Sequence, residues 1–130
     1  MGKLQVMLEK QAALQERVGY DFDSMTTEER VMFIKEMSIH MTQELHEMLY
    51  ELPFFKPWKD YSHIELDEVA DCMISARKEF IDMLHFFMNI AIALGYTHED
   101  GLCADYLHKN KENHKRQDEG YTHDKSFRGQ

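Results

Sequence analysis

The sequence predicts an all-α protein, a helical bundle with four main helices. Three observations support this fold class. The 130 residues include only two prolines and six glycines, which favours a few long regular elements over many turns. Apolar residues recur at intervals of three and four along most of the chain, which is the period of an amphipathic helix. Sequence patterns typical of helix N-termini precede these apolar stretches.

The first predicted helix spans residues 3–18. Its apolar residues mark one face, and Gly19 is suited to the left-handed conformation that ends many helices. The residues of this face are Leu4, Met7, Leu8, Leu14 and Val18.

The second predicted helix begins after Thr26, which forms a capping-box pattern with Glu29. It is expected to end near Leu52, because Pro53 cannot continue it. Its apolar stripe consists of Val31, Ile34, Met41, Leu45 and Met48. The aromatic and basic sequence PFFKPWKDY then connects it to the next helix.

The third predicted helix follows a second capping-box pattern at Ser62 and Glu65, and Gly95 is suited to end it. An apolar residue occurs every three or four positions over its whole length. These residues are Val69, Met73, Ala76, Phe80, Leu84, Phe87, Ala91 and Leu94. Thr97 is the expected cap of a fourth helix over residues 98–116.

We expect a single domain over residues 1–118, followed by a polar tail over residues 119–130. The predicted apolar stripes are wide, which favours a homodimer. The N-terminal sequence lacks the apolar region of a signal peptide, and no apolar run is long enough to span a membrane. The expectation is therefore a cytosolic protein without a membrane partner.

The charge is unevenly distributed. The net charge of the chain is −9, but residues 1–105 carry −11 and residues 106–130 carry +2. General nucleic-acid binding needs a broad basic face, so this acidic composition argues against it. A small phosphate ligand that contacts a local basic patch is not excluded.

Four carboxylates are the strongest candidates for a functional site. The segment QELHEMLYE places Glu44 and Glu47 three residues apart, and KEFIDMLHF places Glu79 and Asp82 three residues apart. Residues at this spacing are neighbours on a helix surface. If the two helices pack antiparallel, all four carboxylates converge, and a divalent cation would offset their repulsion. Such oxygen ligands suit Mg²⁺, with Mn²⁺ as an alternative.

One alternative interpretation of these carboxylates remains, and a second is disfavoured. Pairs of acidic residues at this spacing are common on solvated helix faces. The protein would then be a helical interaction module with an acidic face and no enzymatic activity. A di-iron carboxylate bundle would need two Glu-x-x-His motifs, and the chain has none.

The C-terminal stretch YLHKNKENHKRQDEGY carries the candidate phosphate-binding groups. Tyr106, Lys109, Asn113 and Arg116 fall on one face of the fourth helix. Lysine and arginine bind phosphate oxygens well, arginine in a bidentate manner. Tyr121 lies just past Gly120 and can add a hydroxyl group.

With these motifs, the sequence resembles the all-α nucleoside triphosphate pyrophosphatases, a superfamily that includes MazG and the dimeric dUTPases. Glu44-x-x-Glu47 followed by Glu79-x-x-Asp82 matches the carboxylate pattern of the superfamily. The C-terminal stretch is similar to the closing motif of the dimeric dUTPases and of the related dCTPase/dUTPases of T-even phages. The segments LQVMLEKQAALQ and DMLHFFMNIAIALGY extend the resemblance over nearly the whole chain.

The resemblance implies a Mg²⁺-dependent enzyme that cleaves dUTP, and dCTP as a second substrate, to the monophosphate and pyrophosphate. It also implies a host-cytoplasmic location if the protein is of phage origin. One of the two glutamates Glu44 and Glu47 would act as general base. The implied metal ligands are Glu44, Glu47, Glu79 and Asp82. The implied phosphate- and nucleotide-binding residues are Lys109, Asn113, Arg116 and Tyr121. The implied base-pocket residues are Gln11, Trp58, His85 and Phe86.

The chain departs from the family pattern in two places. Thirty-one residues separate Glu47 from Glu79, more than the usual gap. Leu14 stands where dimeric dUTPases often carry asparagine, which argues against strict uracil specificity. A MazG-like house-cleaning pyrophosphatase that acts on purine or damaged nucleotides is the alternative enzyme.

Overall fold

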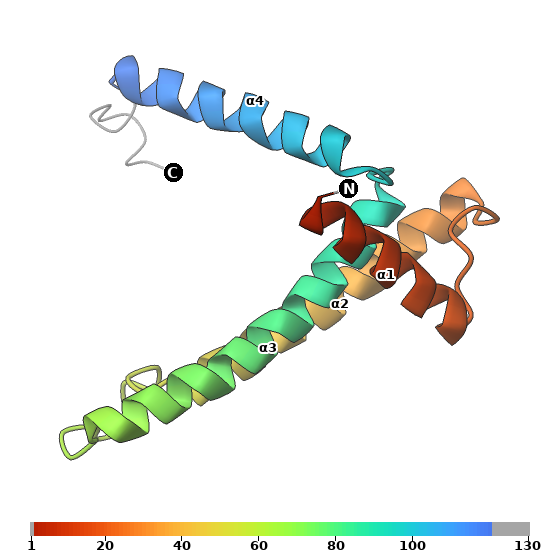
Figure 1. Ribbon diagram of the computed structural model, residues 1–130. Helices are drawn as coiled ribbons and strands as arrows, with labels where there is room; N and C mark the ends of the chain where they lie inside the picture. Colours follow the sequence, from red (N-terminus) through yellow and green to blue (C-terminus); the bar gives the residue numbers. More distant parts are fainter. Residues whose placement is uncertain (1, 121–130) are drawn as a thin grey trace. The chain divides into compact units, whose positions relative to one another are not determined.

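The computed structural model describes residues 2–120, and the described residues form four helices and no strand (Figure 1). The helices are α1 (Lys3–Val18), α2 (Thr27–Glu51), α3 (Leu66–Ala93) and α4 (Glu99–Asp118). The predicted all-α class and the four predicted helices are thus confirmed. No described helix has the length and apolar character that crossing a membrane requires.

The chain divides into two compact units, which are described separately. The first ends at Thr97 and contains α1, α2 and α3, and the second begins at His98 and contains α4. The expectation of a single domain over residues 1–118 stays a prediction.

Helices α2 and α3 form the main structural element, an antiparallel pair that lies side by side over most of its length (Figure 1). Phe33 and Met37 near the start of α2 pack against Ala93 at the end of α3, and all three are buried. Tyr20 and Phe22 from the α1–α2 loop cover this cluster, with their ring centroids 4.9 and 5.2 Å from that of Phe33. The packing fixes which residues of the two helices face each other.

Helix α1 packs against α3 through a smaller core. Leu8 of α1 contacts Met88 and Ile92 of α3, and each of the three is less than 5% exposed. The rest of the buried face of α1 is polar, because it consists of glutamines. These residues are Gln5, Gln11 and Gln15. A polar interface of this kind depends on hydrogen bonds that satisfy the buried amides.

The predicted apolar face of α1 is partly wrong. Leu8 is buried and Leu4 packs against the same cluster, but Leu14 and Val18 are 43% and 64% exposed. The buried positions are 5, 8, 11 and 15, which lie on one helix face. Leu14 lies at the border of this face, so its apolar character could not locate the interface.

Two predicted helix ends are confirmed. The Thr26 hydroxyl accepts a hydrogen bond from the Glu29 amide at 3.1 Å, and the Glu29 carboxylate accepts one from the Thr26 amide at 3.1 Å. This is the reciprocal capping box. Gly19 follows α1 with a φ of 115°, a left-handed conformation that glycine adopts without strain.

Two other predicted caps are wrong. Glu65 occupies the N-cap position of α3 without a side-chain cap bond, so Ser62 lies too far upstream to cap the helix. The Ser62 amide instead donates to Asp60 Oδ1 at 2.8 Å, in a turn before the helix.

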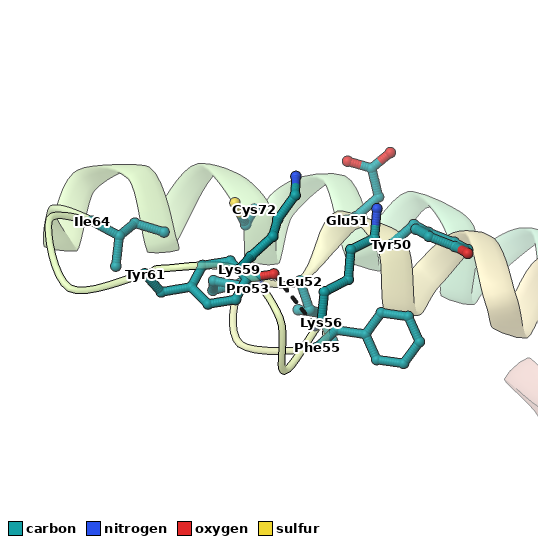
Figure 2. Close-up of a pocket in the computed structure, with 10 residues that line it drawn as sticks. All are labelled: Tyr50, Glu51, Leu52, Pro53, Phe55, Lys56, Lys59, Tyr61, Ile64 and Cys72. Atoms are coloured by element: carbon teal, nitrogen blue, oxygen red, sulfur yellow. Dashed lines mark hydrogen bonds between the residues drawn. The ribbon is translucent and has the colours of Figure 1, made fainter.

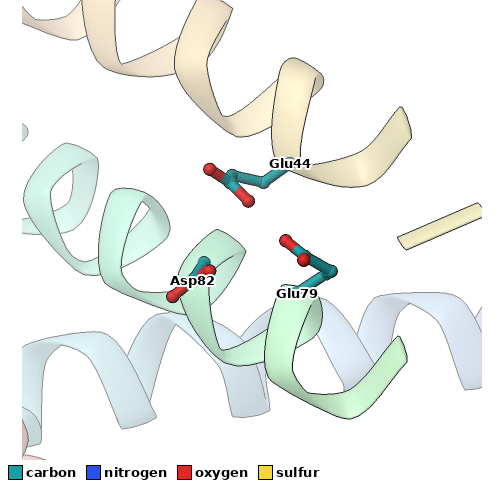
Figure 3. A group of neighbouring side chains, drawn as sticks. All are labelled: Glu44, Glu79 and Asp82. Atoms are coloured by element: carbon teal, nitrogen blue, oxygen red, sulfur yellow. The ribbon is translucent and has the colours of Figure 1, made fainter. Parts of the chain in front are cut away.

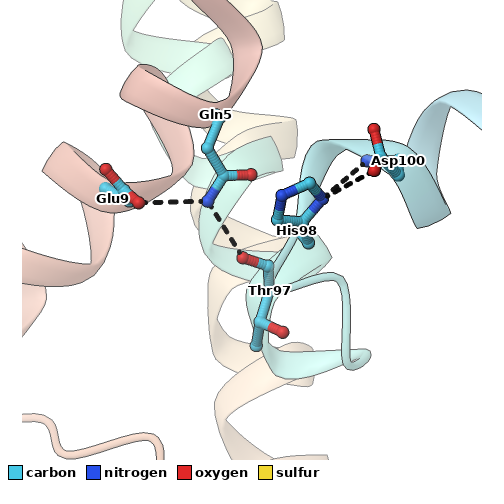
Figure 4. A network of polar contacts seen from close by, with 5 residues as sticks. All are labelled: Gln5, Glu9, Thr97, His98 and Asp100. Atoms are coloured by element: carbon cyan, nitrogen blue, oxygen red, sulfur yellow. Dashed lines mark hydrogen bonds and ion pairs between the residues drawn. The ribbon is translucent and has the colours of Figure 1, made fainter. Parts of the chain in front are cut away.

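The cap of α4 is His98 rather than Thr97. His98 Nδ1 accepts a hydrogen bond from the Asp100 amide at 3.1 Å (Figure 4). Within the first unit, the Thr97 carbonyl accepts a hydrogen bond from Gln5 Nε2 at 3.4 Å, and Gln5 Nε2 also donates to Glu9 at 3.2 Å (Figure 4). The backbone of Thr97 is therefore attached to α1.

The α2–α3 connection and the adjoining helix ends line a small, half-open pocket of about 170 Å³ (Figure 2). The Lys56 amide donates to the Tyr61 hydroxyl at 3.3 Å, and Lys56 Nζ lies 4.6 Å from the centroid of the Tyr50 ring. Phe54 has a φ of 68°, which is unusual for a residue with a side chain, and its ring packs edge-on against Tyr61. Aromatic contacts thus connect residues within this segment and join it to the end of α2.

Candidate active site

Three carboxylates from α2 and α3 converge in the first unit (Figure 3). Glu44, Glu79 and Asp82 each offer one oxygen atom, and these atoms all lie within 4.8 Å of one another. Glu79 and Asp82 are neighbours because they are three residues apart on α3. The antiparallel packing places Glu44 of α2 opposite them, and in Figure 3 the carboxylates of Glu44 and Glu79 point toward each other.

The site raises the proton affinity of Glu44 and Glu79. Burial, followed by the neighbouring Glu79, Glu47 and Asp82, raises the pKa of Glu44 from 4.5 to about 7. For Glu79, a hydrogen bond with Glu44 lowers the pKa, but burial and the charges of Glu47 and Asp82 outweigh it, so the pKa is raised. Like charges in a partly buried site make ionisation unfavourable.

The donor set fits a divalent cation. Glu44 Oε2 is buried and has no hydrogen-bond partner among the described residues. A buried oxygen without a partner costs free energy, and a bound cation removes this cost. Three carboxylate oxygens are hard ligands of the kind that Mg²⁺, Mn²⁺ or Ca²⁺ prefer. The described residues thus contain an acidic cluster with the chemistry of a metal site.

Glu47 is not one of the three converging residues. Its side chain is exposed, although its charge is close enough to raise the pKa values of Glu44 and Glu79. It therefore borders the cluster, one helical turn from Glu44, on the solvent side.

A pocket of about 390 Å³ lies between α1 and α3. It brings together Gln11 and His85, two of the residues expected in a base pocket. His85 is one turn beyond Asp82 on α3, so the pocket is adjacent to the carboxylates along that helix. The full lining consists of Val6, Met7, Lys10, Gln11, Leu14, Ile81, Leu84, His85 and Met88. Such an apolar pocket with a few polar groups is typical of a small-molecule site.

Trp58 and Phe86, also expected in the base pocket, do not line it. Trp58 is 76% exposed in the α2–α3 connection. Phe86 packs against the core cluster around Phe33, and its ring centroid lies 5.4 Å from that of His40. Phe86 follows His85 directly, so it points to a different side of α3.

The expected phosphate-binding residues Lys109, Asn113 and Arg116 are exposed on α4, in the second unit. Lys109 Nζ forms an ion pair with Glu112 at 3.4 Å, and this contact lowers the pKa of Glu112. Tyr121 lies outside the described residues. The role of these residues stays a prediction.

Asn89 was not among the site residues expected from the sequence. It is the most buried polar residue of the described chain, at 2% exposure. It accepts a hydrogen bond from Gln11 Nε2 at 2.7 Å. Its position within the apolar stretch FFMNIAIA is a signal, because a lone amide in such a stretch must find a polar partner in the core.

The pKa of Glu44 predicts how stability depends on pH in the metal-free protein. A carboxyl group whose pKa is higher in the folded than in the unfolded state favours folding when protonated. The contribution of Glu44 is present in full below pH 4.5 and is lost as the pH rises through about 7. Urea unfolding between pH 4.5 and 8 should therefore show a smaller decrease in stability for Glu44→Gln than for the wild type. Equal decreases in both proteins would contradict the assigned environment of Glu44.

Comparison with known proteins places the chain among nucleotide hydrolases. Its sequence matches the dUTPase family over residues 3–103 and 87–121. A dCTP pyrophosphatase of Enterobacteria phage LZ5 is 34% identical over 142 aligned positions, which cover 91% of this chain and 82% of the relative. A dCTP pyrophosphatase of Enterobacteria phage T4 is 30% identical over 141 positions, with the same coverage. No solved structure gave a significant match. The chain therefore belongs to the dUTPase family.

Proposed function

We propose that the protein is a deoxynucleoside triphosphate pyrophosphatase that hydrolyses a pyrimidine substrate, dCTP or dUTP, to the monophosphate and pyrophosphate. Membership of the dUTPase family and two relatives named dCTP pyrophosphatase support this activity. The observation that carries the proposal is the convergence of Glu44, Glu79 and Asp82 one helical turn from a pocket lined by Gln11 and His85.

In this proposal, Glu44, Glu79 and Asp82 hold Mg²⁺, for which Mn²⁺ can substitute. When bound, the ion would neutralise phosphate oxygens and lower the pKa of a water molecule. Glu47 accepts the proton of the attacking water, because it borders the three carboxylates and is solvent-exposed. The water oxygen bonds to the α-phosphorus in line with the bridging oxygen, which leaves with the pyrophosphate and takes the electron pair of the broken bond.

The remaining contacts are assigned by the chemistry of each side chain. Gln11 hydrogen-bonds the base edge, and the apolar walls of the pocket contact the ring faces. Lys109, Asn113, Arg116 and Tyr121 are proposed to bind the phosphates, where cations stabilise the charge of the leaving group. Trp58 and Phe86 remain candidate stacking residues. Because both relatives come from phages, we also propose that the protein acts in the host cytoplasm.

We further propose that the protein is a homodimer. A stripe with a spacing of seven residues runs along α3 and is 47–86% exposed in the first unit. It consists of Leu66, Met73, Phe80, Phe87 and Leu94. Seven residues are about two helical turns, so these side chains lie on one face. A second copy of the chain that presents the same stripe would remove this apolar surface from water.

The dimer can be tested by sedimentation equilibrium. The wild type should sediment with twice the chain mass, and the double variant Met73→Lys/Phe80→Lys should sediment as a monomer, because two charges would be buried in the interface. Val18→Lys, a change at an exposed apolar residue on α1, is the control and should stay dimeric. A wild type that is monomeric at high concentration would disprove the proposal.

The activity can be tested by pyrophosphate release from each of the four common dNTPs and dUTP, with Mg²⁺ and then with EDTA. Release from dCTP or dUTP that EDTA abolishes is the expected result, since the carboxylates need a cation to bind the triphosphate. Release mainly from the purine nucleotides dATP and dGTP would instead favour a house-cleaning pyrophosphatase. No release from any nucleotide would leave a helical interaction module with an acidic face.

The roles of the carboxylates predict a second result. Glu47→Gln and Asp82→Asn should each reduce kcat by at least about 100-fold, because one removes the proton acceptor and the other a metal ligand. Glu51→Gln and Asp71→Asn are matched controls, since they make the same changes at exposed positions on the same two helices. Circular dichroism should show that all four variants are folded. Wild-type activity in Glu47→Gln or Asp82→Asn would rule out the assigned site.

A further inference from the structure

A chain of hydrogen bonds connects the pocket to the protein core through Asn89. Gln11 Nε2 on α1 donates to Asn89 Oδ1 on α3 at 2.7 Å. Asn89 Nδ2 in turn donates to Met37 Sδ on α2 at 3.4 Å. All three side chains are buried, with exposures of 5%, 2% and 5%. The three helices of the first unit thus each contribute one member.

The chemistry of these groups allows only one donor-to-acceptor direction for the series of hydrogen bonds from Gln11 to Met37. A thioether sulfur has no proton to donate, so Met37 can only accept. Asn89 must therefore turn its amide nitrogen toward Met37, which leaves its oxygen for Gln11. Gln11 must then turn its own nitrogen toward Asn89. The sulfur atom in the core thus determines which end of the Gln11 amide faces Asn89.

The result is a fixed orientation of the Gln11 amide, with Oε1 as the end turned away from Asn89. Gln11 lines the pocket, and no described residue donates a hydrogen bond to its Oε1. A free glutamine amide can rotate by 180° and exchange its donor and acceptor ends. Rotation of Gln11 would place its oxygen against the oxygen of Asn89 and leave two buried acceptors facing each other, which is unfavourable.

We propose that Asn89 is a positioning residue that makes the pocket select pyrimidines with an N–H group on the base edge. It does so by holding Gln11 Oε1 as an acceptor for the 4-amino group of cytosine or the N3–H group of uracil. This inference rests on the proposed binding of a nucleotide at this pocket. A pyrimidine ring without such a donor meets an unpaired acceptor, and sites built to hydrogen-bond a group reject analogues that lack it.

Direct binding measurements test the inference without relying on turnover. The probes are dCMP, dUMP and the deoxynucleotide of 2-pyrimidinone, which has the cytosine ring without the 4-amino group. Wild-type protein should bind dCMP or dUMP at least about tenfold more tightly than the pyrimidinone nucleotide in isothermal titration calorimetry. Whichever of dCMP and dUMP binds more tightly identifies the N–H group, 4-amino or N3–H, from which Gln11 accepts a hydrogen bond.

Asn89→Leu and Met37→Leu are the informative variants. Each removes one constraint on the Gln11 amide at similar side-chain volume, so Gln11 can turn its nitrogen toward the ring. Asn89→Leu should bring the ratio of the affinity for dCMP or dUMP to the affinity for the pyrimidinone nucleotide close to one, mainly through tighter binding of the pyrimidinone nucleotide. Met37→Leu should shift this ratio in the same direction. Gln15→Leu is the matched control, since Gln15 is buried on the same face of α1 but does not line the pocket. It should leave the ratio unchanged.

A purely structural role of Asn89 gives a different result. In that case Asn89→Leu weakens binding of all three nucleotides by the same factor, and this outcome would overturn the inference. If Asn89→Leu does not fold, Met37→Leu decides, because leucine for methionine preserves the core volume. An unchanged ratio in that variant also overturns the inference.

The binding data separate this inference from the proposed activity. If the wild type binds nucleotides selectively, Asn89→Leu removes only this selectivity, and the protein has no pyrophosphatase activity, the inference is supported and the activity is refuted. Hydrolysis of dCTP or dUTP, together with an affinity ratio that neither Asn89→Leu nor Met37→Leu changes, would support the activity and refute the inference. Absence of binding by wild-type protein would refute the inference directly.

Discussion

The register between α2 and α3 is the constraint on which the rest of the first unit depends. Phe33 and Met37 lie opposite the C-terminal end of α3, and this packing is built from buried apolar side chains. Because the helices are antiparallel and regular, the same register brings Glu44 opposite Glu79 further along the pair. A shift by one residue on either helix would rotate the carboxylates away from one another. Hydrophobic packing at one end of the pair therefore determines the electrostatics of the site.

The site is electrostatically unfavourable for the metal-free protein. Burial and like charges raise the pKa of Glu44 to about 7, and its buried Oε2 has no hydrogen-bond partner among the described residues. Such groups reduce stability unless they are compensated. The compensation comes from the apolar packing elsewhere along the α2–α3 pair, which is strong enough to hold the carboxylates together. A cation bound to the folded state would add stability by mass action.

Helix α1 packs against α3 through a more polar interface than α2 does. Its interface with α3 includes a small apolar cluster around Leu8, and its other buried residues are glutamines. Polar interfaces contribute less per unit area than apolar ones, but they fix orientation, because each amide needs particular partners. Gln11 and Asn89 illustrate this, since the hydrogen bond between them sets the polarity of the pocket wall. The apolar residues that border this interface, Leu14 among them, line the pocket instead of the core.

The sequence by itself determined the all-α class, the four helices and the carboxylate pairs, because helical periodicity and the spacing of Glu79 and Asp82 are local properties of the chain. It misplaced the caps at Ser62 and Thr97, since cap positions depend on turn geometry. Only the tertiary structure decided that Glu44 joins Glu79 and Asp82 while Glu47 stays at the border, and that Gln11 reaches Asn89. These contacts join residues far apart in sequence, and helix packing, which local periodicity does not encode, sets their register.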